Sequence, residues 1–96
     1  MRLNNFKIHW KYMDCTEQKI QNNKPTEITK KCTEAILEEF KDGEYKEVGL
    51  VKISCYHKDK YDKKVARKES FRRLIASFDK NQRAAFWDQY RKEIKN

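Results

Sequence analysis

Glycine and proline are scarce in this chain of 96 residues, which has two glycines and one proline. A loop that cradles phosphate groups with backbone N–H groups needs several glycines close together. Gly43 and Gly49 have five residues between them and form no such cluster. The sequence therefore excludes a glycine-rich nucleotide loop of the common kinds.

Long apolar runs are also absent. The stretch from Met1 to Asn5 leads directly into a strand-like pattern, so we expect neither a signal peptide nor a membrane span. We expect a cytoplasmic protein.

Cysteine and histidine are few, with three of the former and two of the latter. The number of cysteines is odd, and Cys15, Cys32 and Cys55 show no paired spacing. This argues against a secreted disulfide framework and favours core thiols in a reducing compartment. The pair Cys55 and His57 does not match the spacing of zinc ligands, so we expect no metal and no other cofactor. His9 and His57 lie in strand-like contexts without a nucleophile beside them, so we expect no catalytic residues.

Charge is abundant. Lys and Arg outnumber Asp and Glu by 23 to 15, which gives a formal net charge of +8 and favours anionic partners such as nucleic acid, nucleotides or an acidic protein surface. Apolar residues make up 38% of the chain and include twelve aromatic residues, enough for one core. We expect a single domain, residues 1–96.

The clearest strand begins at Phe6, where two sets of side chains alternate with the period of two that is typical of a half-buried strand. One face carries Phe6, Ile8, Trp10 and Tyr12, and the other carries Lys7, His9, Lys11 and Met13. The segment from Asp14 to Pro25 is polar and predicts a loop.

Residues 29–40 fit either a helix or a strand. The dipeptide Asp42-Gly43 is a preferred two-residue hairpin turn, and Tyr45–Tyr56 resembles a strand, which favours a strand before the turn as well. A two-residue turn would oppose Leu37 to Val48, Ala35 to Leu50, Glu39 to Lys46 and Glu38 to Glu47.

Two helices follow in the sequence. Asp59 can cap a helix over about Lys60 to Ser77, with an apolar side formed by Tyr61, Val65, Phe71, Leu74, Ile75 and Phe78. Asp79 and Gln82 resemble a capping box that opens a second helix, whose broad face carries Arg83, Phe86, Trp87, Tyr90 and Ile94.

The first helix carries a dense set of cations, which we call the basic ridge and which we expect on the side away from Leu74 and Ile75. Its members, the candidate anion-binding residues, are Lys63, Lys64, Arg67, Lys68, Arg72 and Arg73. Like charges at this spacing repel one another, which strengthens the case for an anionic ligand, and a merely solvated face that aids solubility stays an equal alternative. Trp10, Tyr12, Tyr45 and Tyr56 are either core residues or platforms for nucleobases.

Residues Gly49 to Arg73 resemble a group of small phage proteins in which a strand ends in Cys, an Asp-x-Phe-x-Lys step follows, and Gly-Arg-Lys starts a helix. The corresponding residues here are Cys55, Asp59, Tyr61, Lys63 and the triplet Ala66-Arg67-Lys68, and the segment from Asp79 to Tyr90 is similar to the second helix of that group. The resemblance implies a sheet of about three strands followed by two helices, and a phage origin.

We therefore expect an α+β fold in which an antiparallel sheet of about three strands is followed by two C-terminal helices packed on it. The function expected is that of a non-catalytic phage protein that inhibits a host defence system, as an anti-CRISPR protein or a sponge for nucleotide signals. Its partner would be a host defence protein or the nucleic acid or nucleotide that this protein uses. The alternative is a basic nucleic-acid-binding accessory or regulatory protein. Whether the chain forms a homodimer stays open.

Overall fold

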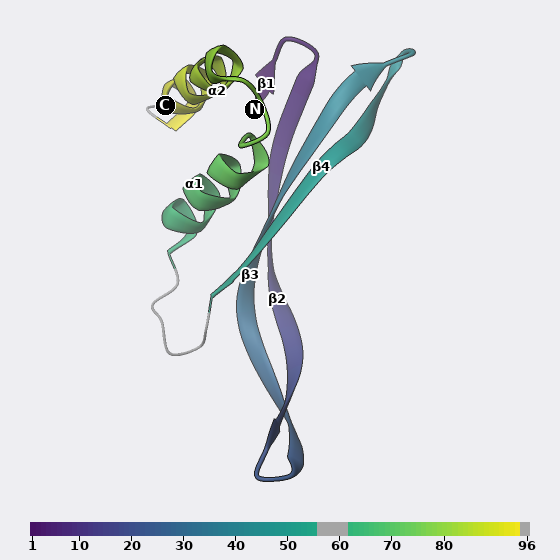
Figure 1. The fold of residues 1–96 in the computed structure, drawn as a ribbon, viewed down its shortest axis with the longest axis vertical. Coiled ribbons are helices and arrows are strands. Elements are labelled where there is room, and N and C mark those ends of the chain that lie inside the picture. Colours follow the sequence, from purple (N-terminus) through teal and green to yellow (C-terminus); the bar gives the residue numbers. More distant parts are fainter. Residues whose placement is uncertain (56–61, 95–96) are drawn as a thin grey trace.

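The computed structural model describes residues 1–55 and 62–94, which form a four-stranded antiparallel sheet followed by two helices (Figure 1). The strands are ordered β1-β2-β3-β4 across the sheet. The elements are β1 (Arg2–Leu3), β2 (Phe6–Gln21), β3 (Lys24–Lys41), β4 (Glu44–Cys55), α1 (Lys63–Leu74) and α2 (Lys80–Ile94). The expected α+β class and the strand over residues 29–40 are confirmed. The fourth strand is β1, which is too short to leave a periodic pattern.

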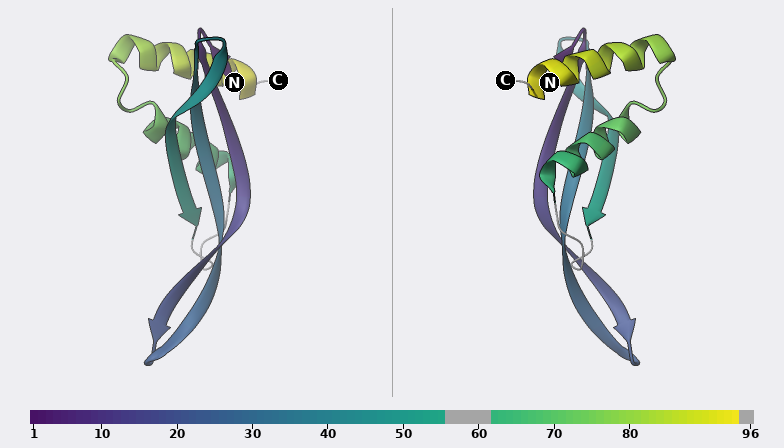
Figure 2. Two further views of the ribbon diagram at one scale, coloured as in Figure 1. Left: turned by 90° about the vertical axis from the view of Figure 1, so that its right-hand side faces the viewer. Right: turned by 90° about the vertical axis from the view of Figure 1, so that its left-hand side faces the viewer.

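Both helices cover one face of the sheet and leave the other open, as the two views of Figure 2 show. The molecule is elongated, with principal extents of 51 × 32 × 23 Å. This length comes from β2 and β3, which continue as a two-stranded arm beyond the end of β4 (Figure 1). The helices and the core occupy the opposite half of the molecule.

The prediction of a loop from Asp14 to Pro25 is wrong, because the arm occupies this segment. Asn22 and Asn23 form its two-residue turn with φ angles of 52° and 60°, a left-handed conformation that Asn tolerates. Pro25 lies on a stretch of β3 that, among the described residues, has only β2 beside it, where a missing N–H is harmless. Apart from the buried Lys30, most residues of the arm are exposed, so its strands lack the alternation of apolar and polar residues that would have revealed them.

The hairpin between β3 and β4 turns at Asp42 and Gly43, as expected, with φ angles of 51° and 83°. Glu39 lies opposite Lys46 and Glu38 opposite Glu47, which confirms the predicted register next to the turn. Farther along, the register shifts.

Leu37 pairs with Gly49 rather than with Val48, and Ala35 pairs with Val51 rather than with Leu50. The reason is a β-bulge at Val48, an extra residue on β4 that the assumption of a regular ladder did not include. The bulge places Gly49 under α1, where an added Cβ atom would lie 3.3 Å from Leu74 Cδ1 and 3.4 Å from Leu37 Cβ. The glycine thus allows close packing of helix on sheet.

Helix α1 begins later than expected. Asp62 is its N-cap and accepts a hydrogen bond of 2.9 Å from the backbone N–H of Lys64, whereas Asp59 lies outside the described residues. Helix α2 begins as predicted, because Asp79 Oδ1 accepts a hydrogen bond of 2.8 Å from the backbone N–H of Gln82. Each acceptor satisfies one N–H group that has no partner within its helix.

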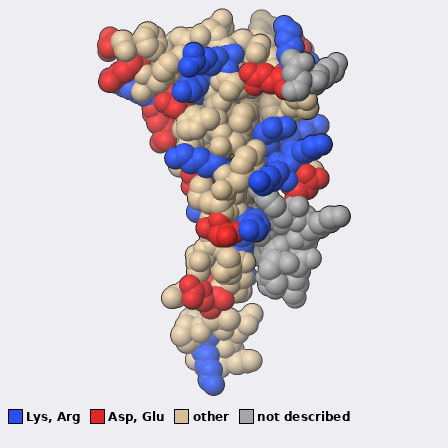
Figure 3. Space-filling model, turned by 180° about the vertical axis from the view of Figure 1, so that it is seen from behind, with Lys and Arg blue, Asp and Glu red and all other residues tan. Residues whose placement is uncertain are grey.

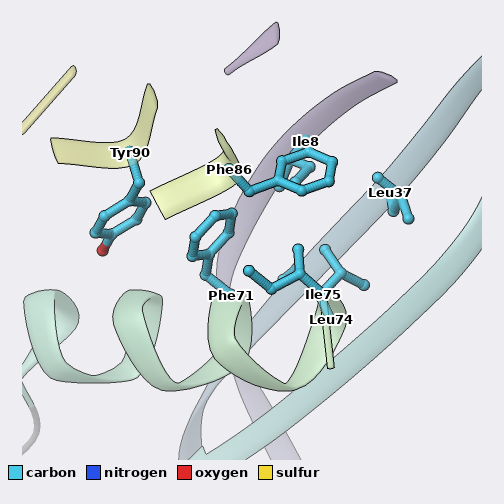
Figure 4. Close-up of a cluster of buried hydrophobic side chains, with 8 residues drawn as sticks. Ile8, Leu37, Phe71, Leu74, Ile75, Phe86 and Tyr90 are labelled. Carbon is cyan, nitrogen blue, oxygen red and sulfur yellow. The ribbon is translucent and has the colours of Figure 1, made fainter. Parts of the chain in front are cut away.

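The core lies between α1, α2 and the covered face of the sheet (Figure 4). Its buried members are Ile8, Ala35, Leu37, Phe71, Leu74, Ile75, Phe86 and Tyr90. Phe78 and Trp87 are only partly buried against this cluster, and Tyr61 lies outside the described residues. Val65 is 64% exposed and Ile94 is 48% exposed, so these two members of the predicted helix faces lie outside the core. Arg83 is exposed as well.

Two cysteines expected as core thiols form a disulfide, Cys15–Cys32, across β2 and β3. Cys15 lies opposite Lys30 and Cys32 opposite Met13, so the cysteines are diagonal neighbours on the open face with Cα atoms 5.9 Å apart. The long ladder of the arm creates this proximity, which the assumption of a loop had hidden. The disulfide removes the reason for expecting a reducing compartment, and the cytoplasmic location stays a prediction.

Candidate anion-binding site

The basic ridge lies on α1, where Lys and Arg side chains gather at mid-height on the right of Figure 3. Lys64, Lys68 and Arg72 are exposed, whereas Phe71 and Leu74 on the same helix are buried. The structure divides the six cations of the ridge into three groups with different surroundings. Two of these groups border separate hollows, which differ in how far their charge is compensated.

The first group is Lys64, Arg67 and Lys68, which line a hollow of about 310 Å³ between the first half of α1 and the second half of α2. We call this hollow the interhelical groove. Its wall on the α2 side is formed by Trp87, Tyr90, Arg91 and Ile94. A volume of this size falls at the lower end of the range for small-molecule sites.

Charge in the groove is unevenly compensated. Lys64, Arg67 and Lys68 make no ion pair with any acidic residue in the described part of the chain, whereas Arg91 is paired with Asp88 at 2.6 Å. Three neighbouring cations next to an apolar surface favour the approach of an anion.

Arg67 and Trp10 give the groove a deeper end. Both line a small cavity of about 50 Å³ next to Tyr90 and Ile94, two residues that also line the groove. Arg67 Nε and Trp10 Nε1 are buried, and neither has a hydrogen-bond partner among the described residues. The Arg67 guanidinium lies 5.8 Å from the centroid of the Tyr90 ring. Buried donors without acceptors are destabilising.

The second group contains Lys63 alone, whose ammonium lies 5.1 Å from the centroid of the Tyr12 ring. These two residues line a separate hollow of about 250 Å³ with Met13, Asp14 and Lys31. Lys31 is paired with Asp14 at 2.6 Å. This hollow therefore carries compensated charge and offers an anion less than the interhelical groove does.

The third group is Arg72 and Arg73, which share the Glu69 carboxylate. The hydrogen bond from Arg72 lowers the pKa of Glu69, and the same bond raises the pKa of Arg72. Glu69 thus neutralises part of this end of the ridge. Arg72 and Arg73 do not line the interhelical groove.

The remaining polar candidates lie elsewhere. On the open face, His9 Nε2 lies 2.7 Å from Glu38 Oε1, and His57 is outside the described residues. No group of three or more potential metal ligands occurs within residues 1–55 and 62–94. Tyr45 lies below the cations of Arg2 and Lys7 at the far end of the sheet.

Sequence reasoning missed the α2 half of the groove. Trp87, Tyr90 and Ile94 share one helical face and were assigned to the core, although only Tyr90 is buried. Trp10 was weighed as a stacking platform, and it instead packs against Phe71 and Tyr90 at centroid distances of 6.2 and 6.1 Å.

Comparison of the chain with protein-family models, curated proteins and solved structures finds no match. The resemblance to small phage proteins thus stays an expectation from the sequence. Neither α1 nor α2 is long and apolar enough to cross a membrane.

Proposed function

We propose that this chain is a non-catalytic binding protein that holds an anionic ligand in the interhelical groove and acts by stoichiometric occupation. The observation that carries the proposal is the convergence of Lys64, Arg67 and Lys68 on an aromatic hollow without acidic partners among the described residues. In the setting that the sequence resemblance implies, the ligand belongs to a host defence system and the protein serves a phage as its inhibitor.

A second candidate function is a nucleic-acid-binding accessory protein, and one feature of the groove favours it. Trp87 is partly buried against the core, so part of its ring stays accessible beside the cations, as in sites where bases stack and phosphates pair with Lys or Arg. Such binding weakens steeply with salt because neutralising phosphates releases counterions.

The experiment compares two double variants of α1 that remove the same charge. Lys64→Gln with Lys68→Gln changes the groove, whereas Arg72→Gln with Arg73→Gln changes the ridge outside it. The probe is a short fluorescent single-stranded RNA of mixed sequence, with binding followed by anisotropy. We expect the groove variant to bind about tenfold more weakly and the control about threefold more weakly at most, since the lost contacts are ionic.

Circular dichroism and thermal melts should show both variants folded, because substitution of exposed charges usually changes stability by about 0.5 kcal/mol or less. Equal loss of binding in the two variants would mean that net charge alone attracts the RNA. Incubation with nucleoside triphosphates should leave them intact, and multiple turnover would contradict a purely binding role.

A further inference from the structure

The outer edge of β2 is open along the arm. Within residues 1–55 and 62–94, the only strand on this edge is β1, whose register covers Phe6 and Lys7. We propose that the open edge binds a second copy of this chain, through antiparallel pairing of the two β2 strands about a two-fold axis at Gln18. The pairing would join the two arms over residues 14–22 into a sheet of four arm strands.

The direction of the backbone groups on this edge follows from the ladder. Ile8 donates its N–H to the Met1 carbonyl oxygen at 2.8 Å, and its own carbonyl accepts from the Met1 amino group at 2.9 Å, so both groups point outward. This direction alternates from residue to residue in an antiparallel strand, and β2 pairs with β3 without a register shift. The N–H and C=O groups of Thr16, Gln18 and Ile20 therefore point outward too, where an added strand can bind them.

The opposite edge of the arm, on β3, is less suited to pairing. Pro25 lies opposite Ile20, so its nitrogen also points outward, and it carries no hydrogen. Proline at an outward position hinders the addition of another strand. From Lys31 onwards the edge of β3 is occupied by β4. The arm thus has its longer free edge on β2.

Charge favours a second copy as the partner and sets the register. The chain carries +8 overall, whereas residues 14–22 contain two carboxylates, Asp14 and Glu17, and one ammonium, Lys19. Two copies can therefore approach here with little of the repulsion that the rest of the chain imposes. An axis at Asp14, Glu17 or Lys19 would set a charged residue opposite itself. The axis at Gln18 sets Glu17 opposite Lys19 of the partner subunit, and the symmetry repeats this contact.

Glu17 and Ile20 both have exposed surface left for this contact. The Glu17 side chain is 50% exposed although it pairs with Lys30, so its carboxylate can accept a second cation. Ile20 is 81% exposed and would lie opposite Thr16 of the partner subunit, which covers part of its apolar surface. Because the paired strands are antiparallel, the two cores would lie at opposite ends of the joined arms, and both interhelical grooves would stay accessible (Figure 1).

Sedimentation equilibrium of the oxidised full chain tests the interface between about 10 µM and about 1 mM, a range suited to a small contact area. We expect a monomer–dimer equilibrium. Gln18→Pro removes an outward N–H of β2, whereas Glu27→Pro removes an outward N–H of β3 from the residue directly opposite. Gln18→Pro should weaken the dimer by about tenfold or more, because the symmetry removes two hydrogen bonds, and Glu27→Pro should weaken it by about threefold at most.

A second pair of variants tests the charge contact without altering the backbone. Lys19→Glu sets two carboxylates opposite each other at both symmetric positions and should weaken the dimer by about tenfold. Lys24→Glu makes the same charge change on β3 and should weaken it by about threefold at most. Circular dichroism and thiol titration show whether each variant keeps the arm and its disulfide. If Gln18→Pro disturbs the arm, the comparison of Lys19→Glu with Lys24→Glu decides.

A chain that stays monomeric at about 1 mM would overturn the proposal. So would a dimer that Lys19→Glu leaves as tight as Lys24→Glu does, or one that Glu27→Pro weakens as much as Gln18→Pro does. None of these results bears on the proposed function, because the interhelical groove lies between α1 and α2, away from the arm.

Discussion

The rings of Phe71 and Tyr90 stack with centroids 4.6 Å apart and planes inclined by 15°, which joins α1 to α2. Tyr90 is 5% exposed and Phe71 is fully buried, so this contact lies at the junction of core and groove. Arg67 approaches the same Tyr90 ring from α1. The position of the groove cations therefore depends on the packing of two core aromatics.

Truncation of Phe71 should for this reason affect stability and site together. We expect Phe71→Ala to lower the free energy of unfolding by about 3–5 kcal/mol, the range for buried aromatic side chains. Val65→Ala is a suitable control on the same helix, because Val65 is 64% exposed, and it should change stability by about 0.5 kcal/mol or less. Urea denaturation followed by circular dichroism measures both. A Phe71→Ala protein as stable as the control would contradict the assignment of the core.

The Cys15–Cys32 disulfide gives a second prediction. It closes a segment of the chain with a sequence separation of 17, and a loop of this length corresponds to stabilisation of about 3 kcal/mol. Reductant should therefore shift the urea midpoint of the unchanged protein downwards and leave that of the Cys15→Ser, Cys32→Ser variant unaffected. Thiol titration should find two more thiols after reduction. If reductant left the urea midpoint unchanged, the stability of the arm would not depend on this disulfide.

Glu69 should make a small acid-sensitive contribution to stability. Its pKa is lowered in the folded chain by the hydrogen bond from Arg72, so the contribution is present above the usual Glu pKa of about 4.3 and is lost as the pH falls through the lower folded value. The melting temperature of Glu69→Gln should thus lie below that of the unchanged protein near neutral pH, and the difference should shrink in acid. Glu27→Gln, in the arm, serves as the control. A difference that grows below pH 4 would have the wrong sign.

The sequence predicted the elements that carry periodic or turn signals. The Phe6 strand, the Asp42-Gly43 hairpin and the Asp79 cap are confirmed, since each depends on local chemistry. The arm from Asp14 onwards was missed because a strand whose residues are mostly exposed has no apolar alternation. The bulge at Val48 was missed because a regular ladder, in which each residue of one strand faces one residue of the other, also gave sensible side-chain pairs.

The candidate site was predictable only in part. All six ridge cations could be read from the helical spacing, yet nothing in that spacing separates Lys64 and Lys68, which border the groove, from Arg72 and Arg73, which share Glu69. That division depends on where α2 crosses α1, a tertiary relationship. The same crossing brings Trp87 beside the cations.

Mapping the ligand-binding residues by NMR is the most direct test of binding in the interhelical groove. In nitrogen–proton correlation spectra, the chain should give two indole signals, from Trp10 and Trp87. Titration with the short single-stranded RNA should move the Trp87 indole signal together with backbone signals of Lys64 and Lys68, because these residues border one groove. Binding in the interhelical groove would be contradicted if the Trp87 signal stayed unchanged and only the signals of Lys7, His9 and Lys11, on the open face of the sheet, shifted.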